Sequence, residues 1–509
     1  MKRDINKLIF LLSYSFIIFS GCNKEWEEHY NITKSDIPKK TLIELISENP
    51  DLSIFYNFLL KTRYDEVLNT SQSYTIWAPI NNALRDIDTT NYELIKKIVT
   101  NHIARSRFTT SEVENKVVRM LNGKYINFIK NGTDYFLGNT KLRDLNIPAK
   151  NGLLHIIDGF LPYIENIWEY IMNTQNLDSL KSYLLSQNKY IFDPINSIEI
   201  GIDSAGNVIY DSVLIYTNLF LDKVGRINNE DSIYTSILLD NNAWIEAYNR
   251  IKKYYNFPEN AGGKKRQRDL TCYNIVKDIL FRGKIYDSDS YDFIKSTTGN
   301  IYYNPYYLFE GDPINLSNGI AYIKLNFPFV DTISWFKKIK VEAEYSEGRV
   351  NSGCNVFLRT SYGTGFNVSN NRYILIDPVS TEPKVEFSIP NVLSAKYNIY
   401  CIFVPGLIVD SSYALPTKVK FKLTYIRRSN GSTFITYLTP VNNVTNPYEI
   451  TKMFAGNFNF EFANVIDEEY DNVSVKLEVI NIVSTAEEQT GTFTRSMRID
   501  CIIFEPVYN

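Results

Sequence analysis

The stretch from Ser73 to Leu84 constrains the fold more than any other part of this 509-residue chain. Tyr74 to Trp77 is an apolar run rich in strand-favouring residues, and it ends at Pro79 because proline cannot donate to a strand ladder. Asn81 and Asn82 follow, and their side chains are well suited to cap a helix. The stretch therefore predicts a strand that leads directly into a capped helix.

A second copy of this stretch lies downstream, from Tyr234 to Trp244. Tyr-Thr, Asn-Asn-Ala and a following apolar residue recur in the same order and without a gap. Such self-similarity indicates that the chain contains a duplicated structural unit. The length predicts about three domains in all, so we expect one further domain beside the two copies.

Composition excludes some functions and bounds others. Hydrophobic residues make up 44% of the chain, enough to build real cores. The net charge of -3 gives no electrostatic basis for binding nucleic acid. Tyrosine is abundant, with 37 residues, which suits a binding surface but is also ordinary in β-rich proteins.

The N-terminus has the pattern of a targeting signal. A basic start precedes an apolar core at Leu8 to Phe19 that is too short to span a bilayer comfortably. Ser-Gly-Cys22 follows and resembles the lipobox of bacterial lipoproteins, with Phe19 in place of the usual Leu. That resemblance implies a signal peptide at 1–22, lipidation of Cys22, and a polar tether at 23–40. The alternative is an ordinary secretory signal in which the cysteine occurs by chance.

Residues 41–163 combine helical periodicity, the strand at Tyr74, and short strands separated by Asn-Gly turns. The unit closes with Asn-Gly-Leu-Leu-His-Ile-Ile-Asp, beginning at Asn151. The stretch from Thr75 to Leu84 resembles the first conserved sequence box of the fasciclin domain, and the closing stretch resembles the second. Asn101-His102-Ile103, between them, resembles the central site of the same family. The resemblance assigns these residues to structural boxes: Trp77, Pro79, Asn81, His102, Asn151, Gly152, His155 and Asp158.

The two histidines of this unit also raise catalytic and metal-binding alternatives. The chain has only three histidines, and it lacks a visible nucleophile with a paired base. We therefore interpret His102 and His155 as core or hydrogen-bonding residues, and we expect no catalytic residue, metal or cofactor. Asn101 stands where the fasciclin family usually has Tyr, which weakens any carry-over of animal-type integrin recognition.

Residues 166–330 repeat the helical periodicity and then depart from the first unit. An inserted hairpin is expected at 198–215, whose Asp203 turn could be mistaken for a calcium loop but lacks the closing Glu. Residues 262–268 are interpreted as a flexible basic loop. The closing box has Tyr322 where the first unit has His, so this is a divergent fasciclin-like domain.

The last third, 334–509, changes to about nine strand-like segments, several with clean polar–apolar alternation. The fold class expected for the whole chain is α+β, with two fasciclin-like α/β repeats followed by an all-β jelly-roll-like sandwich. The final strand resembles those of carbohydrate-binding sandwich modules. Three cysteines here are buried free thiols or include one disulfide: Cys354, Cys401 and Cys501. Acidic residues at 467–471 form a solvated turn or hold a structural calcium.

These features favour a non-catalytic cell-surface lipoprotein of the outer membrane, for adhesion or for binding a glycan or protein ligand. In Gram-negative bacteria such lipoproteins resemble accessories of glycan-uptake systems, beside SusC/SusD-like uptake components. The alternatives are a structural subunit that packs on a TonB-dependent porter and, less favoured, a glycan-active enzyme with a separated carboxylate pair. The membrane would be reached through the lipid anchor only.

If the ligand is a glycan, we expect its site in the last third. Sugar C–H faces stack on aromatic rings, and sugar hydroxyls need polar partners. The candidate rings lie in expected loops or at strand ends beside asparagines: Tyr362, Phe366, Tyr413 and Tyr448. The alternative for each ring is that it covers an edge of the core.

Overall fold

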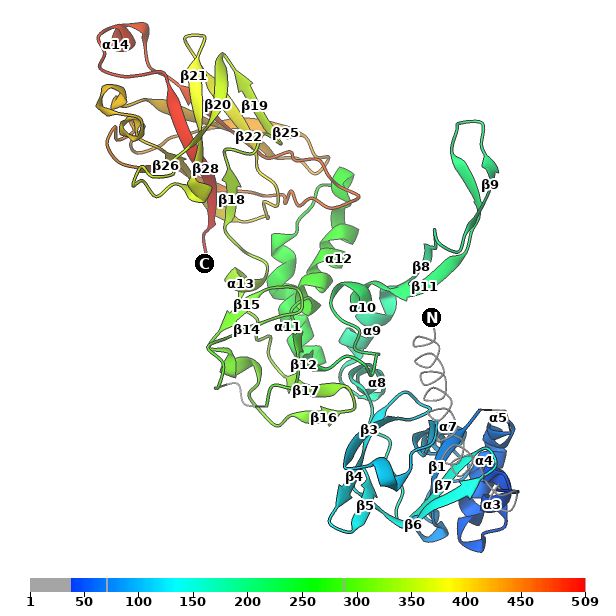
Figure 1. The fold of residues 1–509 in the computed structure, drawn as a ribbon. Helices are drawn as coiled ribbons and strands as arrows, with labels where there is room; N and C mark the ends of the chain where they lie inside the picture. The colour runs from blue at the N-terminus through cyan, green and yellow to red at the C-terminus, as the bar shows by residue number, and fades with distance from the viewer. Residues whose placement is uncertain (1–37, 70–71, 287–288, 509) are drawn as a thin grey trace, which may run out of the picture. The chain divides into compact units, whose positions relative to one another are not determined.

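The computed structural model describes residues 38–69, 72–286 and 289–508, so the signal and Cys22 lie outside the described residues. The chain forms two compact units, divided between Glu165 and Asn166. Of the residues described, no helix combines the length and the apolar composition that crossing a bilayer requires. Each unit is described by itself below (Figure 1).

The first unit places a group of helices before and beside one mixed sheet. Its helices are α3 (Leu42–Ser47), α4 (Ser53–Lys61), α5 (Tyr64–Leu68), α6 (Asn81–Leu84) and α7 (Tyr92–Asn101). Its strands are β1 (Tyr74–Pro79), β2 (Ile103–Arg105), β3 (Asn115–Arg119), β4 (Tyr125–Asn131), β5 (Asp134–Leu137), β6 (Thr140–Ala149) and β7 (Gly152–Ile157).

The predicted strand at Tyr74 is β1, an inner strand of the sheet of this unit. The sheet order is β2-β1-β7-β6-β5-β4-β3, and β1 runs parallel to β7 with Trp77 opposite His155. Both strands are buried along their whole length, which explains why their sequences are continuous apolar runs and not alternating ones. The helix after β1 begins at Asn81, but neither asparagine caps it, so the predicted capping role is wrong.

The second unit opens with a smaller α/β region. Its helices are α8 (Ile167–Asn173), α9 (Asp178–Ser186), α10 (Leu219–Lys223), α11 (Asn241–Ile251), α12 (Gly263–Val276) and α13 (Asp331–Ser334). Its strands are β12 (Tyr234–Leu239), β13 (Leu280–Arg282), β14 (Phe293–Lys295), β15 (Ile301–Tyr303), β16 (Ile314–Leu316) and β17 (Gly319–Lys324). The order β13-β12-β17-β16 repeats that of β2-β1-β7-β6, again with a parallel central pair.

The flexible basic loop expected at 262–268 is wrong, because this segment is the first part of helix α12. Lysine, arginine and glutamine are good helix formers, and tertiary contacts hold the helix start in place. The guanidinium of Arg266 lies 4.5 Å from the ring centre of Phe257 and 4.1 Å from that of Tyr470. Its Nη2 also donates to Asp467 at 2.6 Å. The local sequence shows the charges of this segment but not its packing partners, so the segment resembles a solvated loop.

Residues 188–218 form a ribbon, here called the arm, that leaves the α/β region between α9 and α10 (Figure 1). Its base pairs β8 (Asn188–Phe192) with β11 (Leu214–Asn218), and its tip pairs β9 (Ile198–Ile202) with β10 (Val208–Asp211). The expected hairpin is thus present. Its Asp203 carboxylate accepts hydrogen bonds from the N–H groups of Ala205 and Asn207, as turn chemistry requires.

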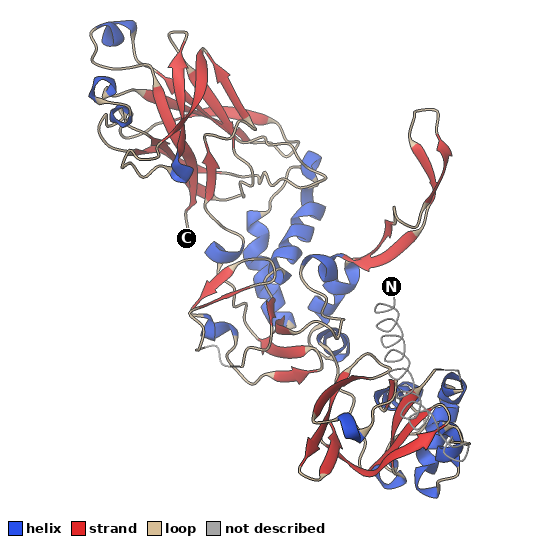
Figure 2. Ribbon diagram, viewed as in Figure 1, coloured by secondary structure: helices blue, strands red, loops and turns tan. Residues whose placement is uncertain are grey.

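The rest of the second unit is strand-rich (Figure 2). One sheet has the order β20-β21-β28-β23-β26, with β18 pairing β28, and the other has the order β19-β22-β27-β24-β25. The strands are β18 (Ile339–Glu342), β19 (Arg349–Ser352), β20 (Cys354–Thr360), β21 (Arg372–Pro378), β22 (Lys384–Ser388), β23 (Lys396–Phe403), β24 (Val419–Ile426), β25 (Thr433–Leu438), β26 (Thr451–Asn459), β27 (Lys476–Asn481) and β28 (Met497–Pro506). A short helix, α14 (Thr485–Gln489), precedes β28.

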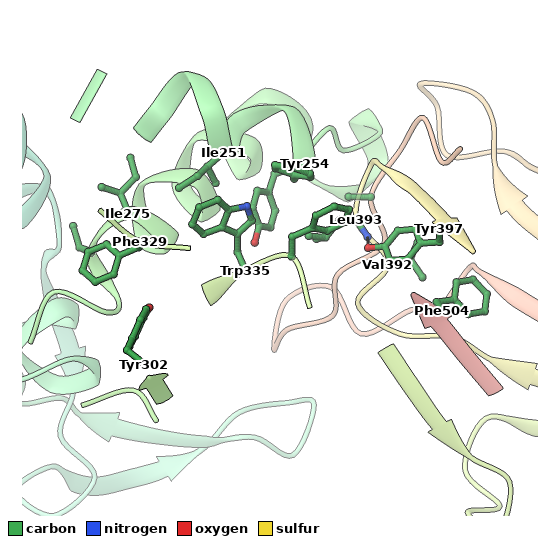
Figure 3. Close-up of a cluster of buried hydrophobic side chains, with 14 of the residues drawn as sticks. Ile251, Tyr254, Ile275, Tyr302, Phe329, Trp335, Val392, Leu393, Tyr397 and Phe504 are labelled. Carbon is green, nitrogen blue, oxygen red and sulfur yellow. Dashed lines mark hydrogen bonds between the residues drawn. The ribbon is translucent and has the colours of Figure 1, made fainter. Parts of the chain in front are cut away.

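The core between these two sheets continues into the α/β region of the same unit (Figure 3). Tyr254 after α11 packs on Phe336, with ring centres 4.6 Å apart, and Phe336 in turn meets Tyr397 on β23 at 5.7 Å. The ring of Tyr397 then contacts Phe504 on β28. This chain of rings explains why residues 166–509 form one compact unit. The cysteines of this unit, Cys272 included, are free thiols.

Candidate functional site

The boxes of the first unit form a core. Trp77 is fully buried, its ring is stacked on that of His155, and Phe128 meets both rings edge-on at 5.6–5.7 Å. Pro79 is buried at the end of β1, and Asp158 is exposed just after β7. These positions favour packing over ligand binding for the aromatic and imidazole groups.

Both histidines have every ring nitrogen occupied. His102 Nδ1–H donates to the Ile98 carbonyl at 2.7 Å, and its Nε2 accepts from the Leu161 N–H at 2.9 Å. His155 uses the opposite tautomer, because Nε2–H donates to the Phe108 carbonyl and Nδ1 accepts from the Asn146 N–H. Burial lowers the pKa of each imidazole to about 4. Neither ring has a lone pair left for a metal or a substrate proton.

Asn81 and Asn151 act as cross-links between elements. Asn81 accepts from the Ile54 N–H at 2.9 Å and donates to the Pro50 carbonyl at 2.8 Å. Asn151 accepts from the Leu42 N–H at 2.9 Å and donates to the Leu68 carbonyl.

Gly152, next to Asn151, is required by a close approach of strands. A Cβ atom at this position would lie 2.0 Å from the Tyr74 carbonyl oxygen on the parallel strand.

The α/β region of the second unit repeats these bonds with its own residues. Asn241 accepts from the Ser179 N–H, and Asn318 accepts from the Ile167 N–H, both at 2.9 Å. A Cβ at Gly319 would lie 1.9 Å from the Tyr234 carbonyl, as at Gly152. Tyr322, which replaces the histidine, donates its hydroxyl to the Ile285 carbonyl at 2.9 Å. A different side chain thus preserves the hydrogen bond to the neighbouring segment.

The four candidate rings of the last third lie on three loops at one end of the sheet that contains β28. The loops are residues 361–371, 405–415 and 444–450. Phe366 and Ile450, from the first and third loops, pack with the second loop's Ile408 around Tyr373. The Leu407 N–H also donates to the Pro447 carbonyl, which joins the second and third loops.

The four rings differ in exposure. Tyr362 is 84% exposed, Tyr413 and Tyr448 are also exposed, and Phe366 is only half-buried. Phe366 therefore supports its loop, while the three tyrosines remain available as a contact surface for a ligand.

Arg498 of β28 is the charged residue beneath these loops, and the sequence alone did not single it out. Arg498 is only 7% exposed, and its buried Nε has no hydrogen-bond partner within the described part of the chain. Burial lowers the pKa of this guanidinium, while the hydroxyls of Tyr373 and Tyr413 act in the opposite direction. Among the described residues, no carboxylate pairs with it. A buried cation without a counter-ion is costly, so this position favours an anionic partner.

A second charged group lies on the same sheet. Ligand atoms of Glu342, Asp500 and Cys501 lie within 4.8 Å of one another. Burial, together with Glu342, raises the pKa of Asp500 to about 6, and burial raises the pKa of the Cys501 thiol to about 12. Two carboxylates suit a hard cation such as Ca²⁺, whereas a protonated thiol contributes little to it.

The sequence signal for this group was an alternating Glu-Ala-Glu at Glu342 together with an acidic residue in the last strand. The sequence instead draws attention to 467–471, where a structural calcium is the alternative to a solvated turn. Burial acts to raise the pKa of Asp467, but hydrogen bonds from Arg266 and the Tyr470 N–H outweigh it and lower that pKa. Asp467 is therefore an ion-pair partner of Arg266.

Comparison with known proteins finds one family model that matches part of this chain. Residues 50–162 match the family model of the fasciclin domain. The resemblance found in the sequence is confirmed for the first repeat. No curated protein matches the chain.

Three solved structures illustrate the other similarities. The FAS1 domain pair of the insect cell adhesion molecule Fasciclin I is 14% identical, with 56% of this chain and 99% of that chain covered and a TM-score of 0.22. The CBM22-1–GH10 modules of Clostridium thermocellum xylanase 10B are 12% identical, covering 34% and 28%, with a TM-score of 0.23. A Paenibacillus xanthan lyase is 13% identical, covering 34% and 13%, with a TM-score of 0.22.

Proposed function

We propose that this chain is a non-catalytic cell-surface lipoprotein that uses its C-terminal third to bind a glycan, or a protein ligand in adhesion. The observation that carries the proposal is that three loops, packed together through Phe366, Ile408 and Ile450 at one end of one sheet, each expose a tyrosine. Rings of this kind stack on sugar faces, and loop ends of a rigid sandwich are common binding positions. The fasciclin domain at 50–162 supports an adhesive role.

The proposal includes an architecture. A fasciclin-like domain at 41–163 is followed by a divergent one at 166–330 and by a jelly-roll-like sandwich at 334–509. The repeated hydrogen bonds of Asn318 and Tyr322 support the second domain, and the two stacked sheets support the sandwich. The lipid on Cys22 would hold the chain at the outer membrane, facing outward, as an accessory of a glycan-uptake system.

A binding experiment with the full mature chain tests this function. Titration calorimetry against a panel of oligosaccharides should find at least one ligand, and Tyr413→Ala and Tyr448→Ala should each weaken binding about tenfold. Tyr437→Ala is the matched control, because Tyr437 is an equally exposed tyrosine on β25 of the other sheet. Equal loss in the control, or unchanged affinity in both loop variants, would contradict the assignment. Product analysis of the same mixtures tests the less favoured enzymatic alternative.

The second candidate function is a structural subunit that packs on a TonB-dependent porter. The observation that favours it is the arm, which carries a dense set of exposed apolar side chains. Absence of any glycan ligand, combined with stable association with a porter, would favour this function over the first.

A further inference from the structure

The arm exposes far more apolar surface than a solvent-facing ribbon needs. Thirteen large apolar side chains within residues 188–218 are between 37% and 89% exposed. They are Tyr190, Ile191, Phe192, Ile195, Ile198, Ile200, Ile202, Val208, Ile209, Val213, Leu214, Ile215 and Tyr216. A standard protein interface uses roughly 20–30 residues on each side, which is about the size of the arm itself. Exposed apolar patches of this extent mark interaction sites.

The apolar side chains occupy both faces of the arm. At its base, Phe192 pairs with Leu214 across the strands, and Tyr190 pairs with Tyr216. Ile191 pairs with Ile215 on the opposite face, because neighbouring residues of a strand point to opposite sides. A partner lying flat on one face would leave the other in water. The partner must therefore enclose the ribbon.

Neither edge of the arm is paired with another strand of residues 38–69, 72–286 or 289–508. The structure gives β8 with β11, and β9 with β10, as sheets of two strands each within the described chain. An isolated two-stranded hairpin is only marginally stable in water, so covering it stabilises it. Its outer N–H and C=O groups can receive a further strand.

These edges and the charges of the arm identify the kind of partner. In a bilayer each unpaired backbone group would cost several kcal/mol, which argues against insertion into lipid. The arm carries one lysine, Lys189, against four acidic residues: Asp193, Glu199, Asp203 and Asp211. Two arms of like charge would repel each other, and a basic rim on a different protein would attract them.

We propose that the arm is a docking element that inserts into a groove of another protein. The groove is apolar inside and basic at its rim, and a strand of the partner extends the free edge of the arm. This inference does not depend on the ligand of the C-terminal third, because the arm leaves the chain from a different region of the unit.

Site-specific crosslinking in cells that naturally produce the chain tests the proposal. A photoreactive phenylalanine analogue replaces Tyr190 in the arm, or Tyr437 on β25 as a control of similar exposure. The arm position should yield one defined adduct with a different protein, and the control should not. Adducts with lipid, or only with a second copy of this chain, would overturn the proposal, as would identical adducts from both positions.

The crosslinked protein, once purified, allows a quantitative test. Ile191→Asp and Ile215→Asp should each weaken its binding to the full mature chain at least tenfold. Val441→Asp, at a side chain 94% exposed outside the arm, should not change the affinity. Raising the salt concentration should also weaken binding, as expected for a basic rim. An affinity that changes neither in the arm variants nor with salt would refute the docking role. Unchanged thermal unfolding of each variant excludes a folding defect.

Discussion

The rings of Trp77 and His155 are stacked, with centres 5.6 Å apart and planes inclined by 13°. The two residues are register partners on the parallel strands β1 and β7, so the stack joins the two family boxes at the centre of the first unit. Both imidazole nitrogens of His155 also form hydrogen bonds with backbone groups. The stacked rings are therefore linked to the neighbouring backbone as well as to each other.

Truncation of Trp77 should strongly destabilise the first unit. Trp77→Ala should cost roughly 3–5 kcal/mol, because it leaves a cavity in a fully buried site. Hydrogen exchange of the β1 and β7 amides in the full chain measures the loss. Trp77→Phe should cost less than half as much, since it keeps a ring and removes an indole N–H for which the described residues offer no partner. A loss below about 1 kcal/mol for the alanine variant would show that Trp77 is not a core residue.

The first unit should lose stability in acid. The folded pKa of His102 and of His155 is about 4, below the ordinary value of 6.5, so the unfolded chain binds more protons between these values. Each histidine should therefore remove up to about 3 kcal/mol of stability as the pH falls from 6.5 to 4. Nuclear magnetic resonance titration of the imidazole signals checks this. Two signals that stay neutral at pH 5 are expected, and ordinary titration near 6.5 would contradict the buried hydrogen bonding.

The loop site should prefer an anionic ligand. A carboxylated sugar such as a hexuronate would pair with Arg498, which has no carboxylate partner among the described residues, so it should bind about tenfold more tightly than its neutral analogue. Calorimetry of Arg498→Gln should show that this preference is lost while neutral sugars bind as before. If the variant and the natural chain discriminate equally, Arg498 does not contact the ligand.

Calcium should stabilise the C-terminal third through Glu342 and Asp500. The folded pKa of Asp500 is about 6, above the ordinary 3.8, so this carboxyl stabilises the fold below pH 3.8 and loses that contribution as the pH rises through 6. At neutral pH a bound cation would offset the cost of burying the carboxylate. Thermal unfolding should therefore shift upward with millimolar Ca²⁺ in the natural chain and not in Asp500→Asn. An equal shift in both would place the ion elsewhere.

The anchor prediction concerns Cys22, outside the described residues. Mass spectrometry of the mature N-terminal peptide should find a lipid-modified cysteine, and Cys22→Ser should release the chain from the membrane fraction. An unmodified peptide cleaved at another position would disprove lipidation.

Local sequence pattern was sufficient for the central strands and their boxes. Tyr74 to Trp77 and its copy at Tyr234 are strand runs followed by asparagines, and each forms an inner strand that is paired on both sides. The role of Asn81 was missed because its partners, at Pro50 and Ile54, lie about thirty residues away. Hydrogen bonds over that separation leave no periodic signal.

The charged residues show the same limit. Arg266 resembled part of a solvated loop because its partner Asp467 is 201 residues away. The sequence did not indicate the role of Arg498, because that role depends on the lack of a carboxylate partner among the described residues. The exposed tyrosines were predictable from loop composition, but the packing of their three loops through Phe366, Ile408 and Ile450 was not, because those residues are far apart in the sequence.

The position of β7 has a mechanical consequence. At the start of β7, the Lys150 N–H donates a hydrogen bond to the Lys40 carbonyl, just before helix α3. At the other end of β7, the chain leaves the unit soon after Ile157. Tension between residues 40 and 163 would therefore act along β7 itself. Because β7 is paired on both sides, with β1 and β6, it can slide only if two ladders of hydrogen bonds shear at once. A domain held in this way resists stretching between residues 40 and 163.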